Sequence, residues 1–209
     1  MPQNKDLKRL VRTRMAETGE NYTQALTRLQ DQVALEPLPR AWRMTGSRAA
    51  EYEAGLVPAA TYDGDRIAQL RLRPAVAEPS GFGALVQSIA ALRYLGRRVS
   101  FSAMVKATEV TGWAGLWLRV DGPNGVLAID NMEDRALRGT TDWTQAAIVL
   151  DVSDQARAIL FGALLSGAGA IDLTRLRFEE AGDTVPTTIP TLPDEPQALD
   201  FGAAPQAAP

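Results

Sequence analysis

Residues 98–125 read RVSFSAMVKATEVTGWAGLWLRVDGPNG and contain two short segments with alternating side-chain character. In 98–106 the odd positions carry Val99, Phe101, Ala103 and Val105, and in 113–121 the aliphatic side chains fall on the even positions. A period of two indicates a half-buried β-strand. Asn124-Gly125 suits a tight hairpin turn. This stretch therefore predicts antiparallel strands.

The same rhythm extends on both sides of this stretch. Turn-forming dipeptides recur at short intervals between Thr45-Gly46 and Ser166-Gly167, with short apolar or alternating runs between them. Strands of this length and spacing are typical of an antiparallel β-sandwich or jelly roll. Two segments, 85–95 and 156–165, are rich in Ala and Leu and fit either a helix or a buried strand, and periodicity alone does not decide between them.

Composition divides the 209 residues into three zones. Residues 1–36 are charged and favour helix, residues 37–180 hold all four Trp, and residues 181–209 are rich in proline and contain acidic but no basic side chains. We predict a helical hairpin, a jelly-roll domain and a disordered tail, because the last zone has too little apolar surface to offset its ordering entropy.

The predicted hairpin follows from helical spacing. Leu7, Leu10, Val11 and Met15 share one helical face, and Gly19 stands where a helix commonly ends. Asn21 or Thr23 would cap a second short helix, with its inward side chains at Ala25, Leu26 and Leu29. This apolar stripe is narrow, so the hairpin is expected to dock on its own domain, on a second copy or on a partner.

The residues that the chain lacks exclude several kinds of chemistry. It contains no Cys and no His, so Ser-His-Asp hydrolysis, Cys-His proteolysis and His-ligated metal sites are excluded, and no metal or cofactor is predicted. An enzyme would need paired carboxylates, and the adjacent Glu179 and Glu180 would face opposite sides of a strand. We therefore predict no catalytic residues.

Charge and hydropathy bear on partners and location. The net charge of −3, from 22 Lys and Arg against 25 Asp and Glu, makes nucleic acid the less favoured partner. No run of 18 apolar residues and no apolar leader segment is present, so we expect no membrane span, no secretory signal and a cytoplasmic protein.

Four stretches together resemble a known kind of domain. They are residues 112–123 (GWAGLWLRVDGP), Asp130-Asn131-Met132, residues 139–143 (GTTDW), and the closing segment from Gly169 to Glu179. Over roughly residues 40–180 the chain resembles jelly-roll domains of the carbohydrate-binding-module type, close to module families 4, 9 and 22. The likeness is to the version appended to intracellular bacterial transcription regulators, including those with AraC-type DNA-binding regions.

The resemblance implies a galactose-binding-like sandwich with one concave face, and it implies that 85–95 and 156–165 are strands. It also implies a difference from the family. The last strand of such domains usually carries an Asp-Asp pair where this chain has Thr174-Arg175. If that pair helps to hold a structural calcium ion in the relatives, this chain is expected to lack the ion.

The leading candidate site lies on residues 113–121. Trp113, Trp117 and Arg119 share one strand face, opposite the aliphatic residues. Flat indoles and a guanidinium suit stacking on a sugar ring or another planar ligand, with the rings reachable from water. The alternative is that Trp117 belongs to the core, with Arg119 as a surface cation over it.

Further candidates are polar or basic. Asp130, Asn131, Asp134 and Arg135 form a polar loop that would bind a ligand hydroxyl or a hard cation such as Ca²⁺, or would only satisfy itself, and Gln87 is a mid-strand groove candidate. The predicted function is non-catalytic recognition of a small molecule, a saccharide or planar metabolite. The alternative is a regulatory or assembly adaptor whose basic hairpin contacts a protein or DNA through Lys5, Lys8, Arg9 and Arg12. The oligomeric state stays open.

Overall fold

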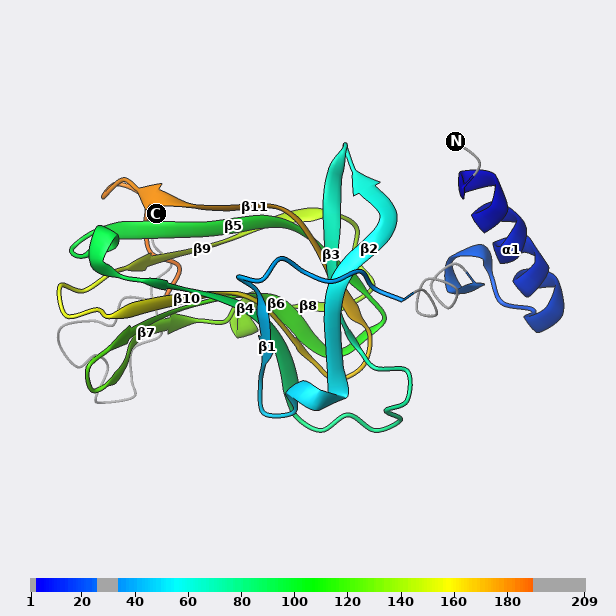
Figure 1. Ribbon diagram of the computed structural model, residues 1–209, viewed down its shortest axis with the longest axis horizontal. Coiled ribbons are helices and arrows are strands. Elements are labelled where there is room, and N and C mark those ends of the chain that lie inside the picture. The colour runs from blue at the N-terminus through cyan, green and yellow to red at the C-terminus, as the bar shows by residue number, and fades with distance from the viewer. Residues whose placement is uncertain (1–2, 26–33, 190–209) are drawn as a thin grey trace, which may run out of the picture.

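The computed structural model describes residues 3–25 and 34–189, and within these residues eleven strands form two antiparallel sheets (Figure 1). Sheet A is ordered β2–β3–β11–β5–β9, with bounds β2 Tyr52–Tyr62, β3 Asp65–Leu72, β11 Ala170–Ala181, β5 Arg98–Thr108 and β9 Thr144–Asp151. Sheet B is ordered β1–β4–β10–β6–β7, with β8 also on β6; the bounds are β1 Arg43–Thr45, β4 Phe82–Ala90, β10 Ala158–Ser166, β6 Val110–Gly122, β7 Gly125–Asp130 and β8 Leu137–Gly139. The predicted antiparallel sandwich is confirmed.

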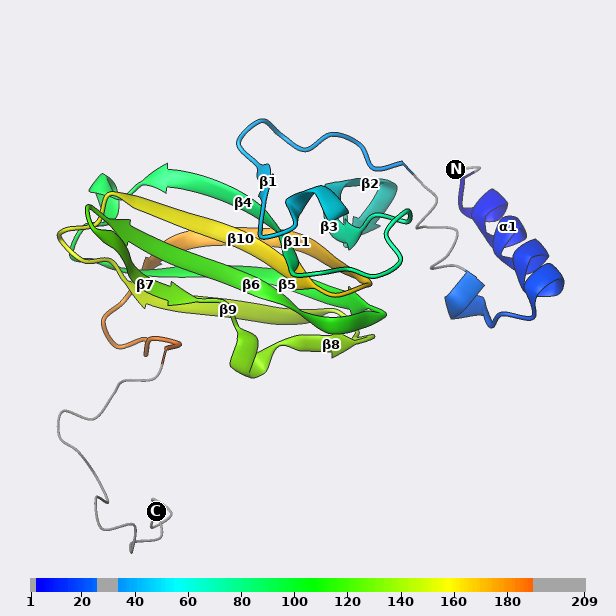
Figure 2. The same cartoon turned by 90° about the horizontal axis from the view of Figure 1, so that it is seen from below.

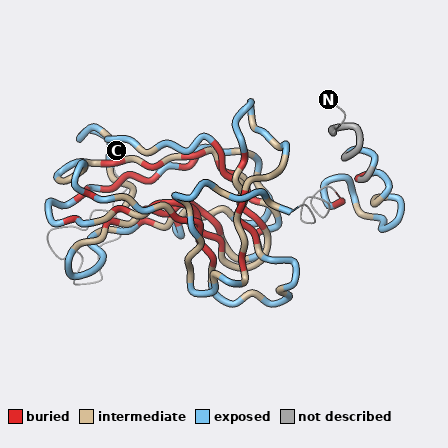
Figure 3. Tube along the Cα trace, in the orientation of Figure 1, coloured by how far each residue is buried: buried red, intermediate tan, exposed pale blue. Residues whose placement is uncertain are grey.

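The core lies between the two sheets, as the buried segments in Figure 3 show. Alternate positions of β5 and β6 point inward, so Phe101, Leu116 and Leu118 are fully buried. Because the strand repeat is two residues, the intervening positions of β6 face away from the core. The alternation in residues 98–121 thus sets which side chains fill the sandwich and which lie on the outer face of sheet B.

The two segments that periodicity left open are strands. Residues 85–95 contain most of β4 and then a short 3₁₀ turn, η2 (Leu92–Tyr94), and residues 156–165 contain most of β10. The strand β10 is central in sheet B and pairs with both β4 and β6. Its two faces are both apolar because sheet A covers one and a second apolar cluster, described below, covers the other. The remaining 3₁₀ turns are η1 (Ala49–Glu51) and η3 (Glu133–Arg135).

The N-terminal hairpin begins with α1 (Gln3–Thr18). Gly19 follows it with φ of 72°, and Asn21 caps the next helical turn by accepting a hydrogen bond from the Gln24 N–H at 2.9 Å. The Gln24 side chain accepts the Asn21 N–H at 3.1 Å in return, which completes a capping box. The predicted positions Leu26 and Leu29 lie outside the described residues. No described helix has the length and apolarity needed to cross a membrane.

The described structure extends beyond the predicted end of the domain at residue 180. Residues 182–189 run along the edge strand β9, where the Thr188 N–H donates to the Val149 carbonyl and the Thr188 hydroxyl accepts the Val149 N–H, both at 2.9 Å. Ile189 packs against the core. The boundary predicted from composition therefore comes too early for this segment, and the rest of the predicted tail, 190–209, lies outside the described residues.

Candidate ligand-binding face

The outer face of sheet B is apolar over much of its area, whereas an exposed sheet face usually carries polar side chains. Seven side chains from three neighbouring strands form what we call the outer cluster: Phe82, Ala84 and Val86 from β4, Leu160 and Leu164 from β10, and Trp113 and Trp117 from β6. The three strands lie side by side in the view of Figure 2. The cluster is separate from the core between the sheets.

Strand register brings these side chains together. Gly162 of β10 lies opposite Trp117 on one side and opposite Val86 on the other. A side chain at residue 162 is excluded, because a Cβ there would lie 1.8 Å from the Leu85 carbonyl oxygen. Because residue 162 is glycine, no side chain of β10 stands between Trp117 and Val86 at this point of the register.

A polar group borders the outer cluster along the same strand. The Arg119 guanidinium lies 5.8 Å from the centre of the Trp117 ring, within the range of a cation–π contact. It also donates a hydrogen bond of 2.8 Å to the Asp121 carboxylate. Because 117, 119 and 121 share strand parity, an indole, a cation and an anion follow one another on one face.

Three polar atoms in this group are buried without a hydrogen-bond partner among the described residues: Trp117 Nε1, Arg119 Nε and Asp121 Oδ1. Each such atom costs about 1–3 kcal/mol when left unpaired. Buried polar groups in native proteins are nearly always paired, so exceptions need an explanation. Two donors and one acceptor at the edge of an apolar surface are what an incoming polar ligand could satisfy.

The structure brings Trp113, Trp117 and Arg119 together on one face, as predicted. It does not leave both indole rings accessible to solvent. Trp113 is half-buried and the Arg119 side chain is 32% exposed, whereas Trp117 is only 7% exposed. The expectation that the flat side of Trp117 is reachable from water is therefore wrong. Trp117 is nevertheless outside the main core, since it packs in the outer cluster.

Gln87 does not lie on this face. It pairs in register with Phe161, a core residue, and therefore has the parity of the inward-facing positions of β4. Gln87 therefore does not contribute to the outer cluster. The parity of β4 could not be read from its sequence, because both of its faces carry apolar side chains.

The polar loop after β7 is occupied by contacts within the protein. The Asp130 carboxylate accepts hydrogen bonds from the Met132 N–H at 2.9 Å, from Arg135 at 2.7 Å and from the Thr188 hydroxyl at 2.5 Å. Burial raises the pKa of Asp130, but these hydrogen bonds outweigh burial, and the pKa is lowered from its ordinary value. Asp130 therefore anchors both its own loop and the C-terminal segment 182–189.

The other predicted loop residues have the same kind of contact. Asn131 accepts the Glu133 N–H at 3.2 Å, and Arg135 also donates to Asp134 at 2.8 Å. Of the three interpretations offered by the sequence, these bonds favour a loop that satisfies itself. No group of three or more acidic side chains suited to a metal ion occurs in the parts of the chain that the structure describes.

The basic residues of the hairpin lie on α1. Lys8, Arg9 and Arg12 are exposed, and the Lys5 side chain lies outside the described ones. Val11 is fully buried and Ala25 is likewise buried, so one side of α1 is covered. Figure 2 shows α1 apart from the sandwich.

Sequence reasoning missed Asp121 and the contributions of β4 and β10 to this face. Asp121 could have been found, because it has the same parity as Trp117 and Arg119 within one strand. Phe82, Leu160 and Leu164 could not, since their proximity to the tryptophans depends on pairing between strands that are distant in the sequence.

Comparison with known proteins supports the fold and gives one curated relative. No protein-family model matches the chain. The chain is 34% identical over 185 residues to an uncharacterised HTH-type transcriptional regulator of Bacillus subtilis (strain 168), YbfP; the match covers 86% of this chain and 62% of the relative. The chain thus spans less than two thirds of the length of that regulator.

Solved structures show the same architecture. The xylan-binding domain CBM22-1 of Paenibacillus barcinonensis Xyn10C matches 69% of this chain and 88% of its own, with a TM-score of 0.50 and 14% identity. The tandem CBM22-1–CBM22-2 structure from the same enzyme matches 69% of this chain and 43% of its own, with a TM-score of 0.51 and 14% identity. The fold is that of carbohydrate-binding-module-type jelly rolls.

Proposed function

We propose that this chain is a non-catalytic ligand-recognition domain that binds a saccharide or a planar metabolite on the outer face of sheet B, within a cytoplasmic regulatory protein. The observation that supports the proposal is the set of three buried, partnerless polar atoms on β6 beside the outer cluster. Resemblance to a transcription regulator and a fold shared with xylan-binding domains point in the same direction.

Each residue of the site has a defined role in this proposal. The Trp117 Nε1–H and the Arg119 Nε–H donate to oxygen atoms of the ligand, and Asp121 Oδ1 accepts a hydroxyl or amide hydrogen. The apolar face of the ligand packs on the partly exposed side chains of the outer cluster, Phe82, Trp113 and Leu160. Because Arg119 covers Trp117 and is itself partly exposed, binding includes a rotation of the Arg119 side chain away from the indole.

The test is a calorimetric and fluorescence titration of the full chain with a defined panel: xylo-oligosaccharides, other neutral oligosaccharides, and indole and flavonoid compounds. Trp117→Phe keeps an aromatic ring but removes the donor, and Asp121→Asn removes the carboxylate. We expect each to weaken binding roughly 5- to 50-fold, the equivalent of one or two hydrogen bonds. Trp143→Phe, outside the outer cluster, is the matched control and should bind normally.

Two outcomes would refute the proposal. One is the absence of saturable binding across the panel with folded protein. The other is binding that Trp117→Phe and Asp121→Asn leave unchanged, which would place the ligand elsewhere on the chain.

A second candidate function, that of an adaptor, is favoured by the exposed basic side chains of α1 and by the relationship to a transcription regulator. In the full chain, Lys8, Arg9 and Arg12 would be changed together to Ala. Reduced retention of duplex DNA in a mobility-shift assay, or of a purified protein partner, would support a contact through α1. Unchanged retention would count against it.

A further inference from the structure

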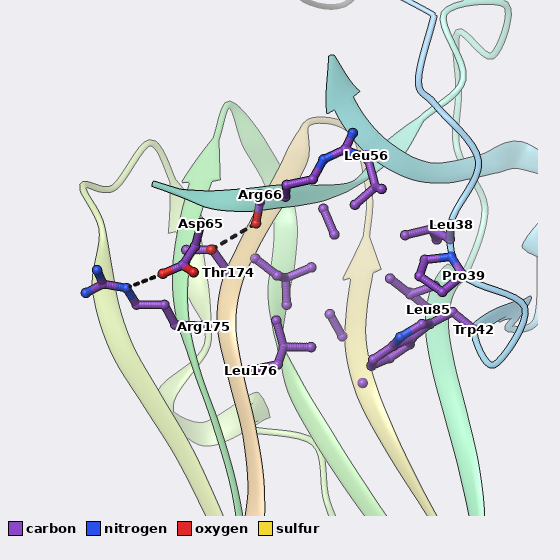
Figure 4. Close-up of a pocket in the computed structure, with 14 residues that line it drawn as sticks. Leu38, Pro39, Trp42, Leu56, Asp65, Arg66, Leu85, Thr174, Arg175 and Leu176 are labelled. Carbon is purple, nitrogen blue, oxygen red and sulfur yellow. Dashed lines mark hydrogen bonds and ion pairs between the residues drawn. The ribbon is translucent and has the colours of Figure 1, made fainter. Parts of the chain in front are cut away.

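A second, different feature lies between the sheets: a half-open apolar cavity of about 310 Å³ (Figure 4). Sheet A contributes Leu56, Ala68 and Leu173, sheet B contributes Leu85 and Ala163, and the segment before β1 contributes Trp42. Leu176 lies at the opposite side of the cavity from Trp42 (Figure 4). The cavity uses the inward faces of β4 and β10, whereas the outer cluster uses their outward faces.

Small side chains leave this space open. Ala68 and Ala163 line the cavity, while two residues further along the same strands Leu70 and Leu165 are fully buried in the core. Protein interiors are otherwise packed as densely as organic crystals. A void of this size is therefore a local departure from the dense packing around Leu70 and Leu165.

Two irregularities in strand register border the cavity. The register of β2 with β3 shifts between Leu56 and Thr61, and the register of β11 with β5 shifts between Thr174 and Arg177. The strands β3 and β11 pair in register only as far as Leu173. Beyond it, the Thr174 hydroxyl donates to the Arg66 carbonyl at 3.0 Å. Bulges bend strands, and here the β2–β3 hairpin stands steeply to the rest of sheet A (Figure 1).

The charges at the mouth are already paired. Arg66 forms an ion pair with Glu36, and Arg175 forms ion pairs with Asp63 and Asp65. A charged ligand would have to place its charge among apolar side chains, which is unfavourable. The lining thus selects against ions and favours an uncharged occupant.

We infer that this cavity binds a compact, uncharged apolar molecule or group, independently of the ligand proposed for the outer face. An apolar cavity of about 150 Å³ holds one benzene ring, so about twice that volume corresponds to roughly two fused rings. The occupant lies between the two sheets against the Trp42 indole. Apolar, preformed cavities of this size are typical of small-molecule sites.

The test uses the full chain and the neutral, polarity-sensitive fluorophore prodan, whose naphthalene body has the two fused rings that the cavity volume allows. We expect saturable binding of one probe per chain, with a blue-shifted probe emission and quenching of tryptophan fluorescence. The informative substitution is Ala68→Phe, which fills the cavity from β3 and should weaken probe binding at least tenfold. The matched control is Ala147→Phe, which adds the same side chain at an exposed position of β9 and should leave binding unchanged.

A second variant protects the test against misfolding. Leu176→Trp blocks the mouth at a residue that is 36% exposed, so it places little demand on the core. Circular dichroism and the unfolding transition report whether Ala68→Phe is folded. If Ala68→Phe is folded, its affinity for the probe is the deciding measurement. If Ala68→Phe is not folded, the affinity of Leu176→Trp for the probe is the deciding measurement.

The inference is overturned by three results. These are no saturable probe binding, full binding by the deciding variant, or loss of binding in Trp117→Phe, which would place the probe on the outer face. Because the two sites lie on opposite faces of sheet B, a failure here leaves the proposed function standing. If no compound of the sugar and metabolite panel binds, the inference about this cavity likewise still stands.

Discussion

Replacing the ion pair beside Trp117 with apolar side chains should make the free protein more stable. The perturbation is the double variant Arg119→Met and Asp121→Val. It removes two of the three buried partnerless atoms, Arg119 Nε and Asp121 Oδ1, and it keeps side chains that can pack on the indole. In most proteins, breaking an ion pair is neutral or destabilising, so an increase in stability is a distinctive expectation.

The magnitude follows from opposing contributions. Two unpaired buried atoms each cost about 1–3 kcal/mol in the native state, and the variant relieves both. It loses an ion pair whose side chains are 32% and 26% exposed, worth about 1 kcal/mol at such exposure, and a cation–π contact worth about 0.5–1 kcal/mol. We expect a net gain of about 2 kcal/mol, or roughly 4–8 °C in Tm for a chain of this size.

The assay is urea unfolding at neutral pH, followed by tryptophan fluorescence and circular dichroism. The control is Arg97→Met with Glu180→Val, which removes an exposed ion pair in sheet A and should change the free energy of unfolding by less than about 0.5 kcal/mol. A midpoint at or below that of the unaltered protein would refute the reasoning. It would mean that Arg119 Nε and Asp121 Oδ1 already have hydrogen-bond partners in solution.

Three further predictions concern the scaffold. Thr188→Val removes the hydroxyl that joins the C-terminal segment to β9 and to Asp130, and urea unfolding should show a loss of about 2 kcal/mol. The pKa of Asp130 is lowered in the folded protein, so its contribution to stability is present above the ordinary value of 3.8 and is lost as pH falls through the lowered value. The difference in unfolding free energy between the unaltered protein and Asp130→Asn should therefore shrink over that acid range, and a constant difference would contradict it. Gly162→Ala would place a Cβ 1.8 Å from the Leu85 carbonyl oxygen and should destabilise by about 3 kcal/mol or more, whereas Gly182→Ala, with open space around it, should change stability by less than about 0.5 kcal/mol in the same assay.

The face of β6 was predictable because its information is local. A single strand with aliphatic residues on even positions fixes where Trp113, Trp117 and Arg119 point, whatever the strand pairs with. The sandwich itself was predictable for the same reason, since turn spacing and alternation are read along the chain. Local patterns therefore predicted the fold class and the β6 residues of the candidate site, Trp113, Trp117 and Arg119.

The remainder depends on pairing between distant segments. Trp117 is covered because β10 and β4 place Leu164 and Val86 beside it, and nothing near residue 117 encodes that register. The segment 182–189 looks like a solvated tail in composition, yet Thr188 bonds to β9 and to Asp130, and the Arg98 side chain donates to the carbonyls of Asp183 and Val185. Contacts of this kind in a polar stretch give no periodic signal, so composition placed the boundary too early.

Both proposed sites are places where the chain departs from the rules that maximise stability. An outer sheet face carries apolar side chains with unpaired polar atoms at its edge, and an inner row carries Ala68 and Ala163 where Leu would fill the space. Natural proteins keep such departures mainly at functional sites, because selection for stability alone removes them. A domain that served only as a platform would have no use for either departure. The stabilising double variant at Arg119 and Asp121 is therefore also a test of function: a gain in stability together with a loss of ligand binding is the combination that a binding site, and not a platform, produces.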